Sequence, residues 1–148
     1  VIADRAELTG ILRTLSDEAR EVAHTEIERI VQGVASGLGG SATVKFTQGA
    51  YLTANDLELE QQTVACLREV AGADRVVPHI PQMGAEDFSA FSRRVPGCYL
   101  FLGVRNEVRG ITHMIHTPKF DVDESCIPFA VSTFADTLVR VSNTWDHR

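Results

Sequence analysis

The chain has 148 residues, of which 44% are hydrophobic and 23% are charged, and these proportions exclude a disordered chain. No apolar run is long enough to span a bilayer, and no secretory signal is visible, so we expect no membrane segment. The net charge of −6 at pH 7 argues against nucleic acid as a partner.

The cysteines indicate a reducing compartment. Their number is odd and their spacing is wide, which is not the pattern of a disulfide framework (Cys66, Cys98 and Cys126). We therefore expect a cytoplasmic protein.

Residues 6–47 are predicted to form a β-α-β unit. Residues 6–15 combine threonines with branched apolar residues, which is typical of a strand. Ser16 offers an N-cap for a helix that ends at a glycine cluster starting with Gly37. Residues 42–47 alternate between polar and apolar side chains, which predicts a second, half-buried strand.

Between residues 48 and 104 the sequence predicts two more helices and two more strands. Asn55 is the expected N-cap of a helix that Gly72 closes, and a short helix is expected to start at Glu86 and end near residue 94. Short strands are expected at 75–77 and 98–104. The second of these is apolar throughout, as in a sheet that is covered on both faces.

A last helix is expected from 123–125 to about Trp145, with Pro128 tolerated because it lies near the first turn. Its apolar residues recur at helical spacing and are expected to be buried (Ile127, Ala130, Val131, Phe134, Leu138 and Val141). The alternation of strands and helices indicates a layered α/β or α+β fold in two structural pieces, with a boundary near residue 48. The start at Val1 reads as an entry in the middle of a fold.

Two histidines fall where α/β proteins build sites. His113 and His116 follow an extended segment and lead into a loop, and loops at strand ends carry functional groups. His116 is a candidate metal ligand, although a single histidine is a weak signal. The alternative is a loop histidine that only orders the turn.

Carboxylates and one arginine are further candidates. Glu86 and Asp87 are adjacent and could perform acid–base chemistry or bind a metal. Adjacent carboxylates at a helix start more often complement the helix dipole, and we prefer that interpretation. The forked guanidinium of Arg13 could bind a carboxylate through two hydrogen bonds, or Arg13 could simply be an exposed strand residue.

The order of the motifs along the chain is more specific than any one of them. In this order they resemble the C-terminal portion of the M20 metallopeptidase superfamily, and most closely its amidohydrolase branch of hippurate and N-acyl-amino-acid hydrolases. The motifs that carry the resemblance are 8–14 (LTGILRT), 55–56 (ND), 83–89 (MGAEDFS), 96–103 (PGCYLFLG) and 116–124 (HTPKFDVDE).

The resemblance implies a fold in two parts. Residues 1–48 would be the second half of an α/β lid domain that also dimerises. Residues 49–148 would be the C-terminal part of a catalytic domain with a zinc-peptidase-like α/β/α sandwich. Each part would lack some of its sheet partners, which would leave strand edges open.

The resemblance also implies a chemistry, which is amide hydrolysis assisted by a pair of divalent metals. His116 matches the histidine of the family's H-[ST]-P motif and would be a metal ligand. Gly84 and Glu86 match a motif at the rim of the substrate pocket, and Arg13 matches a lid arginine that could bind the substrate carboxylate. The metal could be zinc, manganese, cobalt or nickel.

The sequence holds no counterpart of the family's other ligand motifs or of its general-base glutamate. We therefore expect no catalytic residue in this chain, and we expect the chain alone to be inactive. The parent protein would be a homodimeric hydrolase of small N-acyl amino acids. The alternative is a non-catalytic dimerisation or binding module that derives from the same fold.

Overall fold

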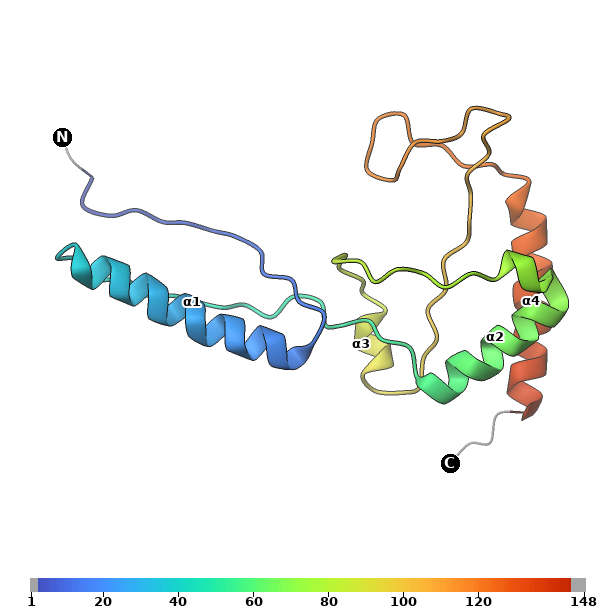
Figure 1. Cartoon of the computed structure of the whole chain (residues 1–148), viewed down its shortest axis with the longest axis horizontal. Coiled ribbons are helices and arrows are strands. Elements are labelled where there is room, and N and C mark those ends of the chain that lie inside the picture. The colour runs from blue at the N-terminus through green and yellow to red at the C-terminus, as the bar shows by residue number, and fades with distance from the viewer. Residues whose placement is uncertain (1–2, 145–148) are drawn as a thin grey trace. The chain divides into compact units, whose positions relative to one another are not determined.

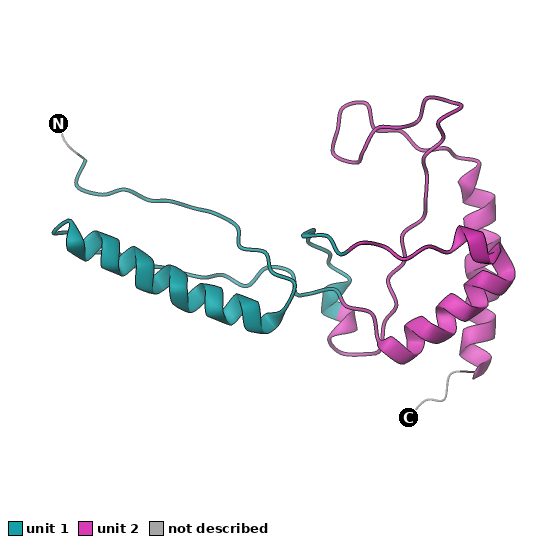
Figure 2. Ribbon diagram, viewed as in Figure 1, with its two compact units in different colours: residues 1–53, 81–90 teal, residues 54–80, 91–148 magenta. Residues whose placement is uncertain are grey.

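Figure 1 shows the computed structural model of the chain, which describes residues 3–144. The chain divides into two compact units, residues 1–53 with 81–90 and residues 54–80 with 91–148 (Figure 2). The helical elements of the described residues follow in chain order: α1 (Asp17–Gly37), α2 (Leu57–Ala71), the 3₁₀ turn η1 (Ala73–Arg75), α3 (Ser89–Ser92) and α4 (Cys126–Thr144).

Helix α1 dominates the first unit and begins where the sequence predicts. The Ser16 hydroxyl accepts a hydrogen bond from the Ala19 N–H at 3.0 Å, which satisfies one of the free N–H groups of the first turn. The helix ends at Gly37, and Gly39 follows with a φ of 77°, a conformation that glycine adopts without strain. The segment after the helix runs back alongside it. The Phe46 ring stacks there on the His24 ring of the helix, with 4.0 Å between the ring centroids.

Helix α2 begins one residue later than predicted. Its N-cap is Asp56, whose carboxylate accepts from the Leu59 N–H at 2.9 Å. The predicted cap, Asn55, instead forms two hydrogen bonds with the backbone of Tyr99. Its Nδ2 donates to the Tyr99 carbonyl at 3.3 Å, and its Oδ1 accepts from the Tyr99 N–H at 2.7 Å. The Asn55 side chain therefore serves a tertiary contact, which leaves the cap to the next residue.

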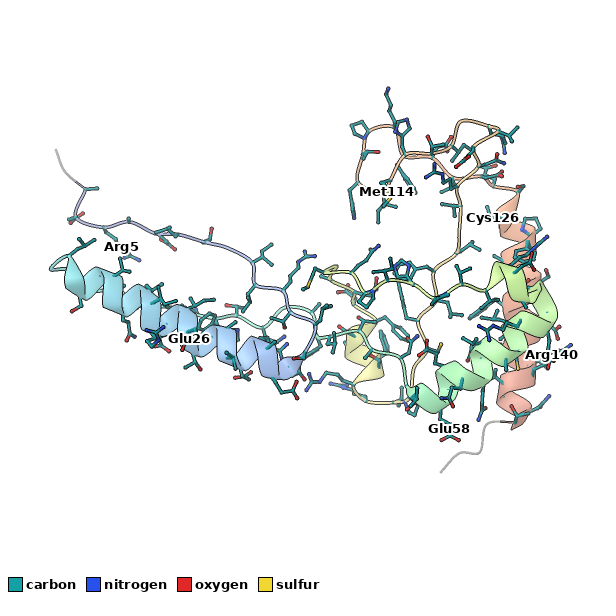
Figure 3. The ribbon with its side chains drawn as sticks, in the orientation of Figure 1. Arg5, Glu26, Glu58, Met114, Cys126 and Arg140 are labelled. Atoms are coloured by element: carbon teal, nitrogen blue, oxygen red, sulfur yellow. The ribbon has the colours of Figure 1, made fainter. Side chains whose placement is uncertain are left out.

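Helices α2 and α4 pack against each other in the second unit (Figure 1). An ion pair joins them, with 3.3 Å between Arg140 Nη1 and Glu69 Oε2. Cys126 and Arg140, labelled in Figure 3, mark the start and the last turns of α4. The bounds of α4 agree with the predicted last helix, and Pro128 lies in its first turn, as expected.

The predicted buried face of α4 was wrong for most of its residues. The residues of α4 that are buried are Thr133, Thr137 and Val141, whereas Phe134 is 60% exposed and Leu138 is 58% exposed. Helical periodicity shows which side chains share a face, but the neighbouring helix decides which face is covered. In this unit the buried face of α4 carries Thr133, Thr137 and Val141.

The predicted strands do not form in residues 3–144. The segments 6–15, 42–47, 75–77 and 98–104 are irregular there, apart from the end of η1 at Arg75. A strand is stabilised by hydrogen bonds to a neighbouring strand, and the described residues contain a single isolated antiparallel bridge, between Asn106 and Ile111. The layers of an α/β sandwich are accordingly not present in this part of the chain.

Little apolar surface is buried. Among the described residues the buried hydrophobic side chains are Ile111 and Val141, while Leu8 and Ile11 are 90% and 83% exposed. The predicted short helix after Glu86 is limited to α3. No helix in residues 3–144 is long and apolar enough to cross a membrane.

The α2 cap gives a testable prediction. We expect Asp56→Ala to lower the free energy of unfolding by about 1 kcal/mol, because the substitution leaves the Leu59 N–H without its acceptor. Asp56→Asn is the matched control and should retain most of the stability, since asparagine caps helices as well as aspartate does. Urea unfolding followed by circular dichroism measures both, and equal losses would contradict the assignment of the cap.

Candidate functional site

The first unit brings Arg13 to the loop that carries two other predicted site residues. The Arg13 guanidinium donates from Nη1 to the Met83 carbonyl at 2.5 Å, across 70 residues of sequence. Gly84 is the next residue, and Glu86 follows two positions later. Three of the four predicted site residues thus belong to one local arrangement within this unit.

Glu86 has a structural role in this loop. Its carboxylate accepts from the Phe88 N–H at 3.3 Å, and its carbonyl accepts from the Ser89 N–H at 3.1 Å. Glu86 thus orders the turn that leads into α3, and the preferred interpretation of a helix dipole contact stays a prediction. At Gly84 an added Cβ would meet no atom within 4 Å, so local crowding does not require glycine there.

Ser89 is the last residue of the 83–89 motif, and no role was predicted for it. It is 1% exposed, and its hydroxyl accepts from the Tyr51 N–H at 3.1 Å. The contact joins the segment after α1 to the loop of Glu86 within the same unit. The signal in the sequence was the position of Ser89 directly after the GAEDF stretch.

His116 lies in the second unit, in an exposed loop that precedes α4. Every residue from 112 to 121 is exposed, and Met114, labelled in Figure 3, marks this loop. Within it the Thr117 hydroxyl donates to the Met114 carbonyl at 2.8 Å, and the Phe120 N–H donates to the Thr117 carbonyl at 3.1 Å.

The backbone of His116 is in an unusual conformation. Its φ is 65°, and it is the one residue other than glycine with a positive φ in the described part of the chain. Such a conformation costs of the order of 1 kcal/mol and is often found where a side chain has a function. The predicted role of His116 is therefore compatible with its backbone, and it stays a prediction.

The described residues do not fit a complete metal site. Residues 3–144 contain no group of three or more histidine, cysteine, aspartate or glutamate side chains that could hold a metal ion. A catalytic zinc normally needs three protein ligands, and a metal pair needs more. His116 could supply only one of them.

Asp123 is a nearly buried carboxylate of the second unit, with 8% of its surface exposed. Its Oδ2 accepts from the Asn106 amide at 2.6 Å, and its Oδ1 accepts from Arg109 Nη1 at 2.6 Å and from the Ser125 N–H at 3.2 Å. These hydrogen bonds, that of Asn106 foremost, lower the pKa of Asp123 to about 2. Neither Asn106 nor Arg109 stands in a motif that predicts a role.

Comparisons with known proteins agree on one family. Residues 6–140 match the sequence model of peptidase family M20/M25/M40. The chain is 35% identical over 144 residues to thermostable carboxypeptidase 2 of Saccharolobus solfataricus, which covers 97% of this chain and 36% of that protein. It is 31% identical to the putative amidohydrolase YhaA of Bacillus subtilis (94% of this chain, 35% of that protein) and 30% identical to IAA-amino acid hydrolase ILR1-like 4 of Arabidopsis thaliana (95% and 33%).

The chain therefore spans about a third of the length of the curated relatives that it matches. No solved structure gives a significant match.

The contacts of Asp123 predict a pH dependence. Because its pKa is lowered to about 2, the ionised group stabilises the fold fully above its ordinary pKa near 4. That contribution is lost as the pH falls from about 4 through about 2. An NMR titration of the Asp123 carboxyl carbon should show a midpoint near pH 2. The substitution Asn106→Ala should raise the pH of that midpoint, because it removes the foremost hydrogen bond. A wild-type midpoint near 4 would show that the hydrogen bonds do not form.

Proposed function

The chain belongs to peptidase family M20/M25/M40, and from this membership we propose that it is the C-terminal part of a metal-dependent amidohydrolase. The match over residues 6–140 carries the proposal, together with the names of the relatives, which are carboxypeptidase, amidohydrolase and IAA-amino acid hydrolase. The substrate class that we propose is a small N-acyl amino acid, whose amide bond the whole protein hydrolyses in the cytoplasm.

Arg13 is the residue we propose for the substrate carboxylate. One of its five N–H groups is used by the Met83 carbonyl, and the side chain is exposed, so other donors of the guanidinium can bind an anion. The contact with residue 83 would hold the guanidinium beside Gly84 and Glu86, for which we propose a place at the rim of the same pocket. The domain assignment, residues 1–48 to a lid and 49–148 to a catalytic domain, is part of this proposal.

His116 is proposed as a ligand of the parent enzyme's divalent metals, which could be zinc, manganese, cobalt or nickel. The described residues do not complete a metal site, so we derive no catalytic step from this chain. The remaining ligands and the general base would come from residues outside it.

A second candidate function is a non-catalytic module that dimerises through the first unit. The observation that favours it is the exposure of apolar side chains along α1, where Val22 is 63% exposed and Val34 is 58% exposed. Exposed apolar patches often mark interaction surfaces. A homodimer through this region would also suit the amidohydrolase, so self-association alone does not separate the two functions.

The 148-residue chain should be inactive by itself. We expect no hydrolysis of hippurate or N-acetyl amino acids after addition of zinc, manganese, cobalt or nickel, because one histidine cannot hold a metal pair. Amino acid release, measured by a ninhydrin assay, checks this. Metal-dependent turnover well above the rate with metal alone would contradict the proposal.

Substitution of the two loop histidines in the complete protein tests the proposed ligand. We expect His116→Ala to lower kcat/KM by more than about 100-fold, because the loss of a ligand impairs the metal site that polarises the amide. His113→Ala is the matched control in the same exposed loop and should change kcat/KM by less than about threefold. Metal content measured on both variants should fall only for His116→Ala. Similar results for the two would remove His116 from the site.

A further inference from the structure

We propose that Asp123 is the residue that positions the loop of residues 112–122, and with it His116. The functional meaning of this inference rests on the proposed function, because His116 matters only if it is a ligand of the parent enzyme. The inference about the loop itself rests on the contacts of Asp123 alone.

The loop has no buried residue of its own. All side chains from 112 to 121 are exposed, so packing against the rest of the unit does not fix their positions. The hydrogen bonds within the loop are local turns, such as the one between Thr117 and Met114. Its position must therefore be set at its two ends.

The N-terminal end is held at Ile111. Ile111 is 9% exposed and forms the antiparallel bridge with Asn106, with N···O distances of 2.8 and 2.9 Å. The side chain of Asn106 also accepts from the Arg109 N–H at 3.1 Å, which closes the turn between the two bridge residues. Residues 106–111 thus form one small closed turn.

The C-terminal end is held at Asp123, and its partners belong to that same closed turn. Its carboxylate binds the side chains of Asn106 and Arg109, each at 2.6 Å. Its backbone N–H donates to the Val104 carbonyl at 3.0 Å. The carboxylate therefore ties the end of the loop to its beginning, and charged hydrogen bonds of this length are among the stronger ones in proteins.

Asp123 also connects the loop to α4. Its Oδ1 accepts from the Ser125 N–H at 3.2 Å, and its carbonyl accepts from the Cys126 N–H at 3.0 Å, at the first residue of the helix. The side chain and the backbone of Asp123 together link the closed turn, the end of the loop and the start of α4. Without that side chain, the His116 loop would be held at one end only by backbone contacts.

The distribution of lysines provides a sharp test. Lysine occurs at two positions in the sequence, Lys45 in the first unit and Lys119 in the loop. An endoproteinase specific for lysine will cleave after these two residues alone, so Lys45 is an internal reference for Lys119. Cleavage rates report how often a segment opens when opening is fast.

We expect Asp123→Ala to raise the rate of cleavage after Lys119, relative to Lys45, by about tenfold, since two charged hydrogen bonds are lost. Asp136→Ala is the matched control, because the Asp136 carboxylate binds Arg140 within α4 at 3.1 Å and has no contact with the loop. This control should leave the ratio of the two cleavage rates, Lys119 to Lys45, unchanged. If Asp123→Ala also leaves this ratio unchanged, the inference is overturned.

Far-UV circular dichroism would show whether Asp123→Ala folds. If it does not fold, variants that exchange the hydrogen-bond donor and acceptor between residues 106 and 123 provide the test. In Asp123→Asn the new amide faces the Asn106 amide, so two donors meet and cleavage after Lys119 should accelerate. In the double variant Asn106→Asp with Asp123→Asn, the hydrogen bond is restored with donor and acceptor exchanged. The ratio should then return towards the wild-type value, and a failure of this rescue would contradict the positioning role.

The same variants in the complete protein separate this inference from the proposed function. We expect Asp123→Asn to lower kcat with little change in KM, and the double variant to recover kcat. If His116→Ala leaves the activity intact while the cleavage ratio responds to Asp123, the proposed role of His116 fails and the positioning of the loop stands. If His116→Ala abolishes activity and Asp123→Asn changes neither readout, the inference about Asp123 is wrong.

Discussion

Backbone N–H and C=O groups need hydrogen-bond partners, and a β-strand takes them from a neighbouring strand; this constraint shapes the structure of residues 3–144. Helices satisfy most of these groups within one segment, so α1, α2 and α4 form at or near their predicted positions. The segments with strand-like sequences find no paired strand in the described part of the chain. The contact between Asn55 and Tyr99 shows the same requirement, because an amide side chain there binds the backbone groups that a strand would otherwise pair.

The pairing of α2 with α4 shows how weakly a helix sequence specifies its own environment. The buried residues of α4 are Thr133, Thr137 and Val141, and the Thr137 hydroxyl has no hydrogen-bond partner among the described residues. Two large apolar residues of the same helix, Phe134 and Leu138, are exposed. A helix places its apolar residues on one stripe by local geometry, but covering that stripe needs a second surface of the right chemistry.

The candidate site depends on long-range contacts of individual side chains more than on regular structure. The Arg13 guanidinium donates a hydrogen bond to the carbonyl of Met83. Asp123, at the end of the His116 loop, forms hydrogen bonds with the closed turn of residues 106–111 and with the first residue of α4. The loop that carries His116 is exposed throughout, so its geometry follows from its anchors at Ile111 and Asp123.

The sequence by itself determined the family, the positions of the main helices and the chemical types of the candidate residues, because caps, helical periodicity and short motifs are local properties of the chain. Ser16 as a cap and the first turn of α4 with Pro128 were predictable for this reason. Only the tertiary structure decided that Asp56 caps α2 in place of Asn55, that α4 buries Thr133 and Thr137, and that Asp123 joins the ends of the His116 loop. Each of these outcomes depends on which partner a side chain finds across many residues of sequence, and local propensities carry no information about that partner.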